Sequence, residues 1–82
     1  MKPAESRRLA LERGAEELAV AIEHLSEERE PPFSIAGADH GEMLTNVLLA
    51  QRIRERIDRG EDAKEAFRAV MAEVRAVVSN DG

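Results

Sequence analysis

The segment from Met43 to Ile53 constrains the fold most strongly, because its apolar side chains point to nearly every side of a helix. A helix that is apolar all the way round is buried all the way round. One copy of an 82-residue chain has little other material with which to cover such a helix. We therefore predict that this segment is the seam of a homodimer, with six interface side chains: Met43, Leu44, Val47, Leu48, Leu49 and Ile53.

The composition supports the same expectation, because the core is thin. Apolar residues make up 43% of the chain, but aromatic residues only 2%, namely Phe33 and Phe67. Cysteine is absent, which excludes disulfides and thiolate zinc sites. Small domains without these supports usually gain stability by association.

The apolar spacing is helical throughout, and no run alternates in the way of a strand. We predict one all-α domain over residues 1–82, in which a long N-terminal helix packs on an antiparallel helical hairpin as a three-helix bundle. The expected elements are a helix over about 3–30, a docked linker over 31–39, a helix over about 40–59 and a helix over about 62–79.

The long N-terminal helix is predicted from one apolar stripe at heptad spacing. The stripe consists of Leu11, Ala15, Leu18, Ile22 and Leu25. Pro31 and Pro32 end the helix, because proline removes a backbone donor and disfavours helical angles in the preceding residue. The linker that follows carries Phe33 and Ile35, which we expect to fold back onto the core.

The residues Asp39, His40 and Glu42 permit two interpretations. A histidine between carboxylates can bind a metal or transfer protons near neutral pH. An aspartate followed three residues later by a glutamate is also the capping box that opens a helix. We favour the cap, because Asp62 and Glu65 repeat the same spacing after Gly60, where we expect the preceding helix to end.

A second group of possible metal ligands lies on the polar side of the N-terminal helix. His24 and Glu28 are four residues apart and could share one face with Glu17, and His40 could join them from another element. A closed site needs about four ligands, which this face does not supply. We predict no metal and no cofactor, and keep a metal-binding helical protein as an alternative.

The sequence offers few residues that could act as catalytic groups. Cys and Tyr are absent, and no serine lies in a glycine-flanked elbow beside a base. The five glycines are scattered, so they form no phosphate-binding loop. We predict that the protein is not an enzyme.

The charges are unevenly distributed along the chain, whose formal net charge is −5. Residues 12–30 carry seven glutamates against two arginines, whereas residues 52–59 carry four arginines against two acidic residues. These can be ordinary solvated faces, or Arg52, Arg56 and Arg59 can form a docking face for an acidic protein surface. Nucleic acid is an unlikely partner for so acidic a chain.

The expected function is a non-enzymatic protein–protein interaction module that acts as an adaptor, subunit or regulator. A small acidic inhibitor of a nucleic-acid-processing complex is a further alternative. No stretch reaches the roughly twenty apolar residues that span a bilayer, so we expect no membrane association and a cytoplasmic location.

Overall fold

The computed structural model describes residues 3–79, with side chains as far as residue 76. The described chain is all-helical, which confirms the predicted class. Its four helices are α1 (Pro3–Glu12), α2 (Ala15–Ser26), α3 (His40–Asp58) and α4 (Ala63–Ser79). The body is broad and thin, with extents of 34 × 31 × 17 Å. None of the described helices is both long enough and apolar enough to cross a bilayer.

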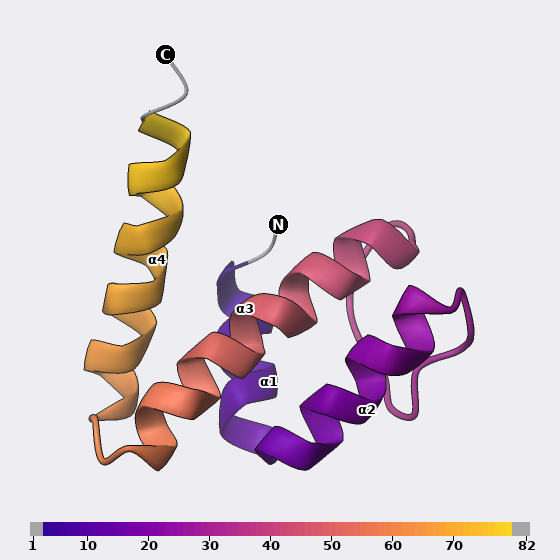
Figure 1. Ribbon diagram of the computed structural model, residues 1–82, viewed down its shortest axis with the longest axis horizontal. Coiled ribbons are helices and arrows are strands. Elements are labelled where there is room, and N and C mark those ends of the chain that lie inside the picture. Colours follow the sequence, from indigo (N-terminus) through magenta and orange to yellow (C-terminus); the bar gives the residue numbers. More distant parts are fainter. Residues whose placement is uncertain (1–2, 80–82) are drawn as a thin grey trace.

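The predicted long N-terminal helix is wrong, because the chain breaks into α1 and α2 at Arg13 and Gly14. Gly14 has extended angles (φ −81°, ψ 167°) and is the N-cap of α2. A straight helix over residues 3–30 would be about 42 Å long, which exceeds the longest dimension of the molecule. The break lets both halves pack against α3 (Figure 1).

The break also changes which side chains of α1 are buried. Leu9, which lies off the predicted stripe, is fully buried, whereas Leu11 is 51% exposed. Leu18 and Leu25 of α2 are buried as the stripe predicts. The heptad stripe therefore predicts the buried face of α2 but not that of α1. Because Gly14 is extended, α1 and α2 have different axes, and one stripe cannot continue from one helix to the other.

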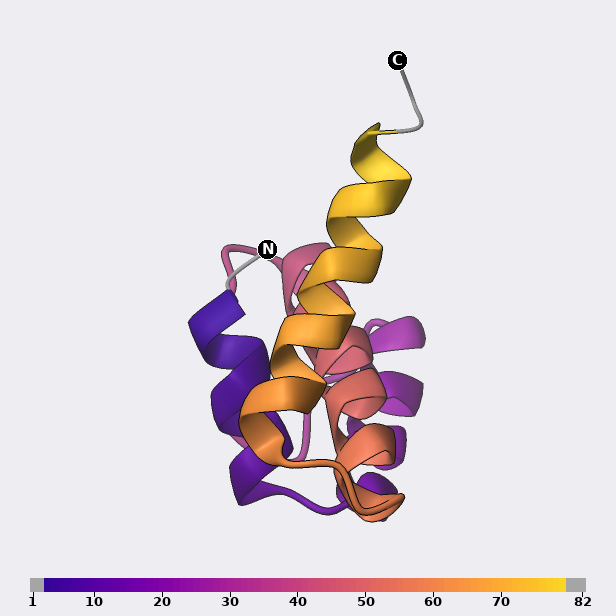
Figure 2. The ribbon, with the colours of Figure 1, turned by 90° about the vertical axis from the view of Figure 1, so that its left-hand side faces the viewer.

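The centre of the fold is α3. It packs extensively against α1 and α2 and along part of its length against α4 (Figures 1 and 2). Its buried side chains are Asn46, Val47, Leu49, Ala50 and Ile53. From the turn that follows α3, α4 diverges, so that its C-terminal half extends beyond the other helices (Figure 1).

The two turns that end α2 and α3 have the same hydrogen-bond pattern. At the end of α3, Gly60 (φ 104°) donates to Ile57 O and Glu61 donates to Arg56 O. This is the Schellman arrangement, which places a left-handed residue just after the helix. At the end of α2 the left-handed residue is Glu28 (φ 59°), where glycine would be less strained.

The linker between α2 and α3 is held by polar contacts as well as by Ile35, which is buried. The backbone N–H of Ala36 donates to Glu5 Oε2 at 2.7 Å, and Ala36 O accepts from Asn46 Nδ2 at 2.9 Å. The guanidinium of Arg8 donates hydrogen bonds to both carboxylate oxygens of Glu5 at 2.7 Å, and it also donates to Ser34 O. These contacts hold the linker to both α1 and α3, and we call the two hydrogen bonds of Ala36 the clamp.

A substitution of Asn46 tests the contribution of the clamp to stability. Asn46→Asp keeps the shape of a fully buried side chain but replaces the donor to Ala36 O with a carboxylate oxygen. We expect it to lower the free energy of unfolding by about 1–3 kcal/mol, measured by urea denaturation. Gln51→Glu makes the same chemical change on the partly exposed side of α3 and should stay within about 0.5 kcal/mol of the parent. Equal effects of the two changes would contradict the clamp.

The contact between Gly37 and Met43 is a second test. A Cβ on Gly37 would lie 2.8 Å from Met43 Cγ and 2.9 Å from the backbone nitrogen of Met43. Gly37→Ala should therefore cost about 1–3 kcal/mol of stability. Gly14→Ala is the control, because a Cβ there meets nothing within 4 Å. A Gly37→Ala protein that melts with the parent would show that the linker can move away from α3.

Candidate functional site

The six predicted interface residues of α3 fall into three classes of burial. Val47, Leu49 and Ile53 are buried within the chain, with exposed fractions of 0%, 8% and 1%. Met43 and Leu44 are partly buried and pack against the core. Only Leu48, at 42%, is largely exposed. The premise that one copy cannot cover this segment is therefore wrong for most of it, because α1, α2 and the linker wrap around α3.

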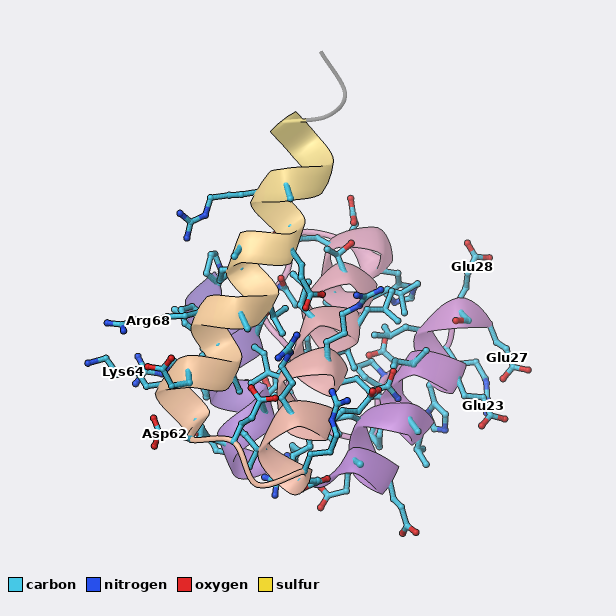
Figure 3. All side chains as sticks on the ribbon, turned by 60° about the vertical axis from the view of Figure 1, so that its left-hand side comes forward. Glu23, Glu27, Glu28, Asp62, Lys64 and Arg68 are labelled. Atoms are coloured by element: carbon cyan, nitrogen blue, oxygen red, sulfur yellow. The ribbon has the colours of Figure 1, made fainter. Side chains whose placement is uncertain are left out.

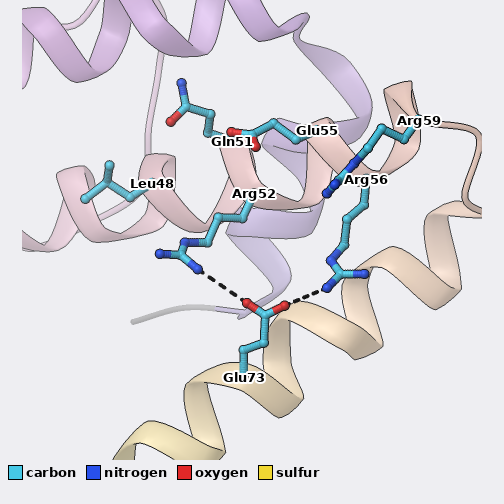
Figure 4. A pocket seen from close by; sticks show the side chains of 7 residues that line it. All are labelled: Leu48, Gln51, Arg52, Glu55, Arg56, Arg59 and Glu73. Carbon is cyan, nitrogen blue, oxygen red and sulfur yellow. Dashed lines mark hydrogen bonds and ion pairs between the residues drawn. The ribbon is translucent and has the colours of Figure 1, made fainter.

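Leu48 lies at one end of a surface that we call the outer face of α3. Its residues are Leu48, Gln51, Arg52, Glu55, Arg56 and Arg59, which recur at helical spacing on the side away from α1. Together with Glu73 of α4 they line an open groove of about 350 Å³ (Figure 4). The groove has an apolar end at Leu48 and a charged end at the arginines.

Two of the three predicted docking arginines are engaged within the chain. Arg56 Nη2 lies 2.7 Å from Glu73 Oε1, and its Nη1 contacts both carboxylate oxygens of Glu61. Arg52 Nη1 reaches the other oxygen of Glu73 at 3.3 Å, so Glu73 lies between two guanidinium groups (Figure 4). The hydrogen bond from Arg56 is the main cause that lowers the pKa of Glu73, and the same bond raises the pKa of Arg56.

Arg59 differs from the other two arginines. It is exposed, and within the described residues it has no ion-pair partner. Arg52 also remains accessible, because its side chain is 65% exposed and its single ion pair is long. The groove therefore retains positive charge that can meet an external carboxylate.

The end of α2 carries the opposite charge. Glu23, Glu27 and Glu28 extend from it into solvent (Figure 3). Glu27 is paired with Arg29, whereas Glu23 and Glu28 have no ion-pair partner among the described residues. This acidic end is opposite in charge to the arginines of the outer face of α3.

The predicted metal candidates do not form a site in the described part of the chain. His24 is half-buried, and its Nδ1 lies 3.0 Å from Glu30 O in the turn after α2. Glu28 occupies the left-handed position of the same turn, and His40 is the first residue of α3. Among the described side chains, no three His, Asp or Glu residues are placed to hold a metal ion.

Asp39, which precedes His40, is the N-cap of α3. Asp39 Oδ1 accepts a hydrogen bond from the backbone N–H of Glu42 at 2.8 Å, as the capping interpretation predicts. Asp62 Oδ2 accepts one from Lys64 N at 3.2 Å at the start of α4. The carboxylate of Asp39 is thus used by the backbone and is not arranged to orient the ring of His40.

Comparison with protein-family models gives a match over most of the chain. A family model described as "Family of unknown function (DUF6952)" matches residues 1–79. The chain belongs to this family. No curated protein and no solved structure matches it. The function of this DUF6952 chain must therefore be argued from its own surface.

Sequence reasoning missed the partners of the predicted arginines. No spacing in the sequence links Glu73 to these arginines, but it contacts Arg52 and Arg56 across the groove. The sequence gives little indication of these Glu73 contacts. They depend on the angle between α3 and α4, which is set at the turn around Gly60 and is not encoded by local spacing. Glu61, five residues after Arg56, could have been paired with it by proximity alone.

The lowered pKa of Glu73 predicts an acid dependence of stability. Because its pKa is lower in the folded chain than in the unfolded chain, the charged form stabilises the fold above the usual carboxyl pKa of 4.5. This contribution disappears as the pH falls through the lowered value. Glu73→Gln should lower the urea midpoint at about pH 7 but not at about pH 2. Glu65→Gln, on the exposed side of α4, is the control, and an equal loss at both pH values would refute the prediction.

Proposed function

We propose that this chain is a non-enzymatic interaction module that forms a homodimer through the outer face of α3 and presents its remaining helix surfaces to other proteins. Leu48 carries the proposal. It lies at the middle of the central helix, and its neighbours Val47 and Leu49 are buried, yet Leu48 itself is 42% exposed. Burying the remaining exposed part of this side chain at an interface contributes about 1 kcal/mol for each copy.

The shape of the molecule supports an interface at this position. In Figure 1 α1 lies behind α3, while α2 and α4 flank α3 on either side, and the body presents a broad face to the viewer. That face measures 34 × 31 Å. A specific interface buries about 800 Å² on each partner, which a face of this size can supply.

The chemistry of the outer face also suits a protein partner. A single exposed apolar side chain is commonplace on a monomer. Here it adjoins an open groove with three arginines, and arginine is enriched in protein interfaces. Apolar contact then supplies affinity, while the charges determine orientation.

The alternatives have less support in the structure. A metal-binding role would need ligands that converge, and His24 and His40 are each placed in helix-end positions. An acidic inhibitor would use the carboxylates of α2, but several of these are already paired within the chain, including Glu17 with Arg13 and Glu27 with Arg29.

Light scattering after size-exclusion chromatography tests the proposal. We expect the parent to be dimeric at micromolar concentration and Leu48→Asp to be monomeric, because the interface would then bury a carboxylate. Leu11→Asp is a matched control: Leu11 is also an exposed leucine, and each new carboxylate lies four residues from an arginine, Arg7 or Arg52. Circular dichroism should show that both variants keep their helices. A monomeric parent would overturn the proposal.

A further inference from the structure

The charges of the α2–α3 pair are separated along its length. These two helices pack side by side and run in opposite directions (Figure 1). The acidic end of α2, with Glu23, Glu27 and Glu28, therefore lies beside the start of α3. The arginines of the outer face lie towards the other end of α3, at positions 52–59. The pair thus has one negative and one positive end.

Leu48 lies between these two ends. It is close to the midpoint of α3, which runs from His40 to Asp58. Arg59 follows it by three helical turns, and the acidic end of α2 lies on the opposite side of it along the helix axis. Leu48 therefore lies between charges of opposite sign along the axis of α3, and such an order complements itself when a second copy is turned by a half-turn.

We propose that the partner on the outer face of α3 is a second copy related by a two-fold axis that passes beside Leu48, perpendicular to α3. The two α3 helices are then antiparallel, and each Leu48 contacts its counterpart. Arg59 of each copy faces Glu23 at the acidic end of α2 in the other copy. This arrangement rests on the homodimer proposed above and adds its register.

The opposite register is disfavoured by the same charges. If the axis ran parallel to α3, the two helices would be parallel, and the arginines of one copy would meet those of the other. Like charges in contact across an interface are costly, and this kind of repulsion selects the register more than it alters the affinity. In the antiparallel register, the unpaired guanidinium of Arg59 and the unpaired carboxylate of Glu23 each gain a partner.

Disulfide trapping tests the register directly, because the chain contains no cysteine. In the antiparallel dimer, Leu48→Cys places two thiols at the axis, within the Cα separation of less than about 7 Å that a disulfide needs. Mild oxidation should therefore give a covalent dimer. Arg59→Cys should not, because the two copies of residue 59 lie at opposite ends. Because Leu48→Cys would cross-link in either register, Arg59→Cys decides between them: its cross-linking would establish a parallel register and overturn the proposal.

A charge exchange tests the pairing of Arg59 with Glu23. Arg59→Glu and Glu23→Arg should each weaken the homodimer by about tenfold or more, because each places like charges opposite one another twice. Mixing the two variants should restore the parent affinity, since both contacts in the mixed dimer are then between opposite charges. The double variant in one chain should also recover. Lys64→Glu and Glu65→Arg make the same charge changes on α4 and should have no effect; Lys64 is marked in Figure 3.

The results separate the two proposals. A parent that is monomeric at every concentration overturns the homodimer and its register together. A stable parent dimer in which Arg59→Glu and Glu23→Arg leave the dissociation constant unchanged overturns only the register. Weakening by each single variant with recovery in the mixture establishes the pairing, because a loss of folding could not be reversed by a second variant chain.

Discussion

The two hydrogen bonds made by the backbone of Ala36 are the interaction on which the rest of the structure depends. They join a buried carboxylate on α1 to a buried amide on α3 through the linker between α2 and α3. A buried carboxylate is costly unless it is paired. Arg8 supplies that pair with a two-point contact to Glu5. Charge-assisted bonds of this kind are stronger than neutral ones, so the clamp fixes where α3 begins relative to α1.

This placement of α3 explains how one short chain covers most of the apolar side chains of its central helix. α1 and α2 contact α3 as two separate helices, and Ile35 of the linker adds a further buried side chain. What remains outside is a single leucine and a row of charged side chains. The covered core and the exposed outer face are consequences of the same break at Gly14.

The sequence was informative where structure is determined locally. The helical class follows from apolar periodicity, and the cap at Asp39 follows from the spacing of two acidic residues. The break at Gly14 was missed because the heptad spacing of apolar residues from Leu11 to Leu25 runs past it without interruption. The covering of Val47 and Leu49 could not be read from the sequence, since it depends on how the first two helices turn around the third.

The features of the candidate surface likewise fall into those that local spacing determines and those that packing determines. Arg52, Arg56 and Arg59 could be grouped from their helical spacing, and the structure does place them on one face. Their engagement by Glu73 and Glu61 depends on the angle at which α4 leaves the turn, which no local pattern reports. Leu48 could not be distinguished from its neighbours by type, because its exposure is a property of packing.

The way α4 diverges has a consequence for the dynamics of the chain. Among its described side chains, which end at residue 76, the buried ones are Ala66, Val70 and Met71, in the half nearest the turn. Beyond Met71, Val74 packs partly against the core, and Glu73 forms an ion pair with Arg56 that is partly open to water. We therefore expect α4 to be the helix that detaches first in a sub-global opening, while the α1–α2–α3 core stays folded. Such an opening would free both arginines from Glu73 and change the charge of the groove without unfolding the domain.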